Sequence, residues 1–232
     1  MNSKRVIAGS VRNPWDWYVS VWAYGCDGEG DLRRRLAGPV RLLGHGYRES
    51  PAMGVSNLLR ELVRPRRPWR ETYADSSSPE LFRRWLTFLL DPARSRQPGE
   101  DYWRSPLSSF AGFYTYRYCR MFHRTVDHLY DGGVSGVEAL READERLNIV
   151  QCMIRMENIT EGIFRLLDMA GIEPGEGTAG NIRRIGRTNP SSRKRETSFY
   201  YDRATSELVG NRDALIVEKY GYRPPEPTVS AR

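Results

Sequence analysis

Apolar residues are grouped along the chain in runs whose spacing predicts strands and helices. Residues 5–11 and 148–156 are mostly continuous apolar runs, and each leads into a helical pattern, so residues 5–24 and 149–170 both predict a strand, a turn and a helix. Continuous rather than alternating apolar runs are typical of strands covered on both faces, as in a parallel sheet. The pattern therefore predicts an α/β fold with helices on both faces of a parallel sheet.

The rest of the chain predicts further helices separated by loops. Helical spacing is found in four stretches: residues 79–90, between Ser78-Pro79-Glu80 and Asp91-Pro92, then residues 108–130, 136–147 and 205–220. Gly, Pro and Arg in irregular order predict loops over residues 31–78, with one short helix at 55–63, and over residues 173–188. We expect a single domain over residues 1–232, with residues 223–232 as a frayed tail.

The composition favours an anionic ligand without choosing one. The net charge is +7, and only Lys4, Lys194 and Lys219 among the 36 basic residues are lysines. This arginine excess has two interpretations, an arginine-favouring genome or bidentate binding of phosphate and sulfate oxygens. Three widely spaced cysteines predict neither a disulfide framework nor a zinc site, and we expect no metal. No apolar run is long enough to span a membrane, so we expect a cytoplasmic protein.

The most specific string in the chain is Val11-Arg12-Asn13-Pro14-Trp15-Asp16-Trp17-Tyr18-Val19-Ser20. Arg12 follows the first predicted strand, where open α/β sheets bind ligands, and the helix after it presents a positive amino end. Ser20 lies about two turns further and adds a hydroxyl donor if it shares the face of Arg12. The two residues predict a site for one phosphate group. The structural alternative is that Arg12 caps the sheet edge and Ser20 is an ordinary helix residue.

This string resembles the sulfotransferase motif that holds the 3′-phosphate of 3′-phosphoadenosine 5′-phosphosulfate (PAPS) through its Arg and its Ser. Residues 154–172, which contain Glu157-Asn158, are similar to a second family motif, in which some relatives place an aromatic residue at the position of Met156. Residues 189–222 resemble the closing section, a basic loop before a final helix that ends in Gly-Tyr. The resemblance implies a P-loop-like three-layer parallel sheet, and Arg12, Ser20, Arg193 and Lys194 as PAPS-binding residues, with Arg195 as an alternative to Arg193.

The resemblance covers the middle and the end of the family's domain. The family's lysine-containing, glycine-rich loop for the 5′-phosphosulfate has no counterpart, because Lys4 lacks surrounding glycines and the next lysine is Lys194. We therefore expect an N-terminally incomplete domain that lacks the first strand-loop-helix unit. Three explanations stay open: a fragment, a second chain that supplies the missing unit, or a noncatalytic remnant.

The implied function is transfer of a sulfuryl group from PAPS to a hydroxyl of a small molecule or glycan. This reaction needs a base for the acceptor hydroxyl. His45 is a candidate, whereas His123 and His128 fit a structural or exposed role better, so the catalytic residue stays unknown. A second hypothesis is a noncatalytic anion-binding or nucleotide-binding protein, including a basic nucleic-acid binder. The chain has no recognisable nucleic-acid-reading motif, which makes nucleic acid the less favoured partner.

Overall fold

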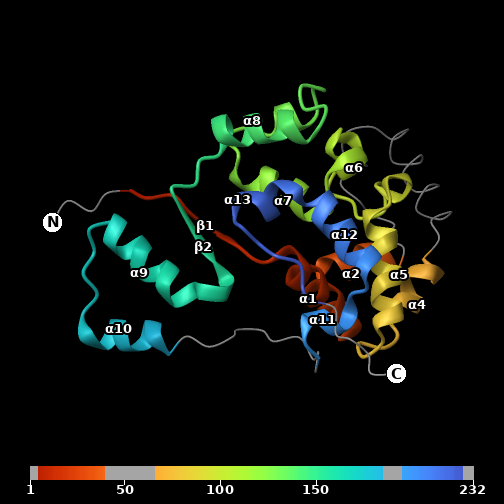
Figure 1. Cartoon of the computed structure of the whole chain (residues 1–232), viewed down its shortest axis with the longest axis horizontal. Coiled ribbons are helices and arrows are strands. Elements are labelled where there is room, and N and C mark those ends of the chain that lie inside the picture. The colour runs from red at the N-terminus through yellow and green to blue at the C-terminus, as the bar shows by residue number, and fades with distance from the viewer. Residues whose placement is uncertain (1–4, 40–65, 185–194, 227–232) are drawn as a thin grey trace.

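The chain forms a mostly helical α/β structure with one small parallel sheet, as Figure 1 shows. The structure is a computed structural model that describes residues 5–39, 66–184 and 195–226. The elements in chain order are β1 (Ala8–Val11), α1 (Pro14–Cys26), α2 (Asp31–Ala37), α4 (Arg67–Thr72), α5 (Pro79–Leu90), η2 (Pro92–Arg94), η3 (Tyr102–Arg104), α6 (Leu107–Phe110), α7 (Phe113–Phe122), η4 (Asp127–Leu129), α8 (Val137–Leu147), β2 (Cys152–Arg155), η5 (Met156–Asn158), α9 (Ile159–Met169), α10 (Glu176–Arg183), α11 (Thr197–Tyr200), α12 (Arg203–Arg212) and α13 (Ala214–Lys219).

The sheet pairs β1 with β2 in parallel, and Ser10 lies opposite Ile154. Phe122, the last residue of α7 (Phe113–Phe122), lies so close to one face that a Cβ on Gly9 would be 2.7 Å from its ring. Helix α9 covers β2 on the other face, where a Cβ on Gly162 would lie 2.5 Å from Ile154 Cγ2. These two glycines let a helix approach each face of the sheet.

The prediction that both strands are covered on both faces is wrong for β1. Ala8 and Ser10 are exposed, whereas α9 packs mainly against β2. Among the described residues the sheet has two strands. The coarse α/β prediction therefore holds, whereas a three-layer sheet of several strands is not observed.

The hydrophobic core lies between the helices and is built largely from aromatic side chains. Trp22 of α1 contacts the rings of Phe82 and Tyr200 at centroid distances of 5.4 and 5.6 Å, and its indole N–H donates to the carbonyl oxygen of Thr72 at 2.8 Å. In Figure 1 most of these helices gather on one side of the sheet, with α9 and α10 on the other. The core thus fixes α1, which leads directly from β1.

Two of the predicted loops contain helices. Residues 31–78 were predicted to be a loop, but Asp31–Ala37 and Arg67–Thr72 are α2 and α4. The short helix predicted at 55–63 lies outside the described residues. Residues 173–188 were also predicted to be a loop, but Glu176–Arg183 forms α10, with Ala179 and Ile182 buried. The glycine and arginine content of these stretches led to the wrong prediction of loops, because short helices can pack through only a few apolar residues.

The buried carboxylate of Asp213 lies where two of the predicted helices are interrupted. The stretch 205–220 breaks at Asp213 into α12 and α13. The Asp213 carboxylate accepts hydrogen bonds from the Thr115 N–H at 2.9 Å, the Thr115 hydroxyl at 2.7 Å and the Tyr18 hydroxyl at 2.7 Å. A Cβ on Gly112 would lie 2.5 Å from Asp213 Oδ1, and here the stretch 108–130 divides into α6 and α7. Helix α7 ends before His123, which forms an antiparallel bridge with Asn148.

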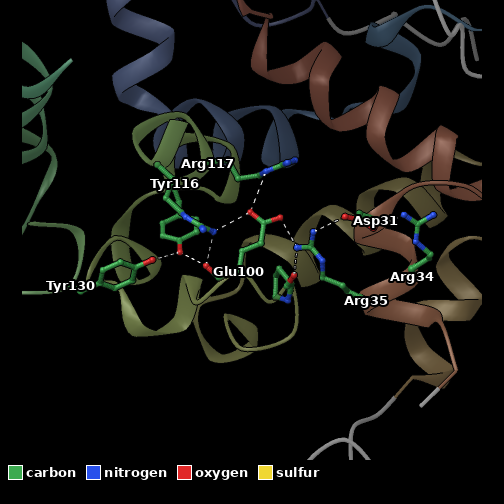
Figure 2. Close-up of polar contacts among 9 residues, drawn as sticks. Asp31, Arg34, Arg35, Glu100, Tyr116, Arg117 and Tyr130 are labelled. Carbon is green, nitrogen blue, oxygen red and sulfur yellow. Dashed lines mark hydrogen bonds and ion pairs between the residues drawn. The ribbon is translucent and has the colours of Figure 1, made fainter. Parts of the chain in front are cut away.

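Three arginines surround Glu100 and hold the loop before η3, as Figure 2 shows for most of the cluster. The Glu100 carboxylate lies 2.5 Å from Arg35 Nη1, 3.4 Å from Arg117 Nε and 3.5 Å from Arg120 Nη1. The Arg120 guanidinium and the Tyr116 hydroxyl also donate to the Glu100 carbonyl oxygen. Glu100 has φ of +59°, a conformation that L residues seldom adopt, so these contacts hold a strained turn between α2 and α7.

Candidate functional site

The site forms where β1 passes into α1. Val11 is buried at the end of β1, and the Asn13 side chain caps α1 by accepting a hydrogen bond from the Trp15 N–H at 3.0 Å. Between them, Arg12 donates from Nη1 to the Ser20 hydroxyl at 3.0 Å. The structure thus brings together the two residues that the sequence predicts for the phosphate site. Their role in binding phosphate stays a prediction.

Asp16 is the site residue that the sequence analysis missed. Its Oδ2 accepts a hydrogen bond from Arg12 Nε at 2.5 Å and also forms an ion pair with Arg12 Nη2. The side chains of Arg12 and Asp16 are 27% and 18% exposed, so solvent reaches the pair only in part. A signal was present, because Asp four residues after Arg places both on one side of the turn into a helix. We call Arg12, Asp16 and Ser20 the Arg12 site.

Tyr114 of α7 fixes the backbone at Arg12. The Arg12 N–H donates to the Tyr114 hydroxyl at 2.9 Å, and this hydroxyl donates to the Arg12 carbonyl oxygen at 3.2 Å. The Tyr114 ring stacks on Trp17 with centroids 4.4 Å apart. Burial raises the pKa of Tyr114 above its ordinary value, which keeps the phenol protonated and able to donate.

Glu157 connects the three stretches that resemble sulfotransferase motifs. Its Oε1 accepts a hydrogen bond from the Asn13 N–H at 2.6 Å, and its Oε2 accepts one from the Tyr222 hydroxyl at 3.2 Å. The Arg155 guanidinium lies over the Tyr222 ring, 4.6 Å from its centroid. Met156, by contrast, is 41% exposed. The Glu-Asn and Gly-Tyr segments therefore meet at the start of α1, beside the Arg12 site.

Helix α11 reaches the site through its first residue, Thr197. The Thr197 hydroxyl donates to Asp16 Oδ1 at 2.8 Å. Arg195, two residues earlier, is exposed and places its guanidinium 5.4 Å from the centroid of the Phe199 ring. The predicted binding residues Arg193 and Lys194 lie outside the described residues. Of the closing basic residues, the structure therefore places only Arg195.

Two of the three histidines belong to a separate cluster around the buried His123 and Asp144, which we call the His123 network: His123, His128, Asp144, Asn148 and Lys219. His123 Nδ1 lies 2.9 Å from His128 Nε2, and His123 Nε2 lies 3.0 Å from Asp144 Oδ1. Asp144 also accepts hydrogen bonds from Lys219 Nζ at 2.5 Å and from Asn148 Nδ2 at 2.9 Å. Burial opposes ionisation of Asp144, but the bonds from these partners prevail and lower its pKa to about 2.

The His123 network lies at the opposite end of the sheet from the Arg12 site. Asn148 precedes the amino end of β2 and pairs with His123, whereas Arg12 and Glu157 follow the carboxyl ends of the strands. A four-residue strand alone separates the two ends by about 10 Å. The His123 network is therefore separate from the Arg12 site. His45 lies outside the described residues.

The described residues include no group of His, Cys, Asp or Glu side chains that could hold a metal ion. None of the helices in the described ranges is both long and apolar enough to cross a membrane.

Comparisons with known proteins do not assign the chain to a family. No family model, curated protein or solved structure matches it.

Proposed function

We propose that the chain binds PAPS, or its product adenosine 3′,5′-bisphosphate, with the 3′-phosphate held jointly by Arg12 and Ser20. The observation that carries the proposal is the hydrogen bond of 3.0 Å between Arg12 Nη1 and the Ser20 hydroxyl. A phosphate monoester accepts hydrogen bonds from both guanidinium and hydroxyl groups. The site also lies at the carboxyl end of a parallel strand and the amino end of a helix, the place where open α/β sheets bind phosphates.

The surroundings of Arg12 support the same proposal. Glu157 and Tyr222, from the second and third stretches of resemblance, lie at the start of α1, and Thr197 joins the closing section to Asp16. Three stretches that are far apart in the sequence thus converge on one site. In this proposal β1 and β2 are part of a P-loop-like sheet, and α7 and α9 are the layers on its two faces.

The proposed activity is transfer of the sulfuryl group of PAPS to a hydroxyl of a small molecule or glycan. The Arg12 site would hold the nucleotide, and it would not touch the transferred group, which is attached at the 5′ end of the donor. The proposal therefore separates into nucleotide binding, which Arg12 and Ser20 would supply, and sulfuryl transfer, which needs a base still to be identified. A protein that binds the bisphosphate but transfers no sulfuryl group would be a noncatalytic nucleotide-binding protein.

Calorimetric titration with adenosine 3′,5′-bisphosphate tests the binding step. Loss of a hydrogen-bonded guanidinium should weaken binding by Arg12→Ala about 10- to 100-fold. The matched control is Arg203→Ala, which removes the same charge from a side chain that is 89% exposed and pairs with Glu207. Equal binding by the wild type and Arg12→Ala would end the proposal.

Salt dependence separates this proposal from nucleic-acid binding. The affinity of a protein that contacts many phosphates falls by about 10³ or more between about 50 and 200 mM salt. The affinity of a pocket for one nucleotide should fall only modestly over the same range. A steep loss, together with tight binding of single-stranded or duplex DNA, would favour the nucleic-acid hypothesis. Release of adenosine 3′,5′-bisphosphate from PAPS in the presence of candidate acceptors then tests sulfuryl transfer.

A further inference from the structure

Asp16 occupies the Nε and Nη2 edge of the Arg12 guanidinium, which could otherwise bind a phosphate through two N–H donors. Nε and Nη2 both face Asp16 Oδ2, and Nη1 donates to the Ser20 hydroxyl. These contacts use three of the five guanidinium N–H donors. Within the described part of the chain, two N–H donors then remain for a ligand, on the Nη1 and Nη2 end of the group. Asp16 therefore decides which end of Arg12 can meet a phosphate.

The same carboxylate joins two segments that are far apart in the sequence. Asp16 Oδ1 accepts the hydrogen bond from Thr197, which begins α11. Helix α11 packs against α1, and the Tyr201 hydroxyl just after it donates to the Trp15 carbonyl oxygen at 3.0 Å. Arg195 lies two residues before Thr197, which is itself held against α1 by Asp16. One carboxylate thus contacts both the proposed phosphate-binding arginine and the first residue of α11.

We propose that Asp16 is a positioning residue for phosphate recognition, which aims the Nη end of Arg12 toward the Ser20 hydroxyl and anchors the start of α11 through Thr197. An arginine side chain that is not held in place loses rotamer freedom when it binds a ligand. Asp16 holds the Arg12 side chain in one orientation before the ligand binds, so this entropy is not lost on binding. The phosphate can then contact Arg12 and Ser20 together. This inference rests on the proposed function for the identity of the ligand, but the Arg12, Asp16 and Thr197 contacts exist without a ligand.

A simple affinity change in Asp16→Asn would not test the proposal, because removing a negative charge also reduces repulsion of a phosphate. A double-mutant cycle with Ser20→Ala avoids this difficulty, since Ser20 is uncharged. If Asp16 aims Arg12 at Ser20, loss of the Ser20 hydroxyl should weaken bisphosphate binding about 5-fold or more in the wild type and less than about 2-fold in Asp16→Asn. Equal losses in both backgrounds would overturn the positioning role. Asp31→Asn, which removes a carboxylate paired with Arg34 and Arg35, is the matched charge control.

A ligand-free measurement separates failure of this inference from failure of the proposed function. The Arg12 Nε–H signal in an ¹H–¹⁵N spectrum should exchange slowly with water in the wild type and in Asp31→Asn. It should exchange fast in Asp16→Asn, and at an intermediate rate in Thr197→Val, in which Asp16 Oδ1 no longer accepts from a hydroxyl at residue 197. Absence of bisphosphate binding with this exchange pattern intact would reject the nucleotide and keep Asp16 as the residue that orients Arg12. Fast exchange already in the wild type would reject the role of Asp16.

Discussion

Replacing Asp213 by Ala should destabilise the fold strongly, because three buried donors meet at its carboxylate. Asp213 and Tyr18 are fully buried, and Thr115 is 1% exposed. The substitution leaves the Tyr18 hydroxyl, the Thr115 N–H and the Thr115 hydroxyl without their acceptor, and each buried unsatisfied donor costs about 1–3 kcal/mol. Loss of the buried charge offsets part of this sum. We expect a net decrease of about 3 kcal/mol in the free energy of unfolding, a large part of a typical total of about 5–15 kcal/mol.

Urea unfolding followed by tryptophan fluorescence measures this change, and Asp31→Ala is the control for loss of an exposed aspartate, 68% exposed. Asp213→Asn should cost less, since its oxygen still accepts from Thr115 and its amide can donate to the Tyr18 hydroxyl. Burial raises the pKa of Asp213, so the folded protein holds this proton more tightly than the unfolded chain does. The stability of the wild type relative to Asp213→Asn should therefore decrease as pH rises from about 4. An Ala variant within about 1 kcal/mol of the wild type would refute the reasoning.

Three further predictions concern other parts of the fold. Burial and the neighbouring His123 lower the pKa of His128, so the unfolded state binds this proton more tightly and stability should fall as pH drops below about 6.5. Between pH 7 and 5 the melting temperature should therefore decrease less in His128→Gln than in the wild type. Equal decreases in the two proteins would contradict the assignment. Glu100→Gln leaves three partly exposed arginines without their shared carboxylate and should cost about 1–2 kcal/mol in urea unfolding, whereas no change would show that the cluster contributes nothing. In Gly162→Ala the new methyl group would lie 2.5 Å from Ile154, so the free energy of unfolding should decrease by about 1–3 kcal/mol and the melting temperature should fall. An unchanged melting temperature would mean that α9 can shift on the sheet to make room.

Helices with local signals were predictable from the sequence. Ser78 caps α5 by accepting a hydrogen bond from the Leu81 N–H, and Asn13 caps α1. Ser and Asn are favoured cap residues, and Pro is favoured in the first turn of a helix, so Ser78-Pro79 and Asn13-Pro14 are local signals for a helix start. The breaks at Gly112 and Asp213 were not predictable, because they depend on contacts between α7 and the α12–α13 junction, about 100 residues apart. Periodicity within one segment carries no signal for such a contact.

The same distinction applies to the site. Arg12 and Ser20 were predictable as a pair because Ser20 follows Arg12 by eight positions, across a single strand-to-helix connection. Asp16 shares this local geometry and was missed only because the expectation concerned cationic and hydroxyl groups. Thr197 and Glu157 reach the site from 181 and 144 residues away in the sequence, and only the folded chain reveals them.

The central claim is that Arg12 recognises a phosphate on the 3′ position of a nucleotide. The most direct measurement compares the affinities of adenosine 3′,5′-bisphosphate and adenosine 5′-monophosphate for the wild type and for Arg12→Ala. We expect the bisphosphate to bind the wild type at least about 10-fold more tightly than the monophosphate, and this preference to disappear in Arg12→Ala. A wild type that does not distinguish the two nucleotides, or a preference that survives in the variant, would contradict the account.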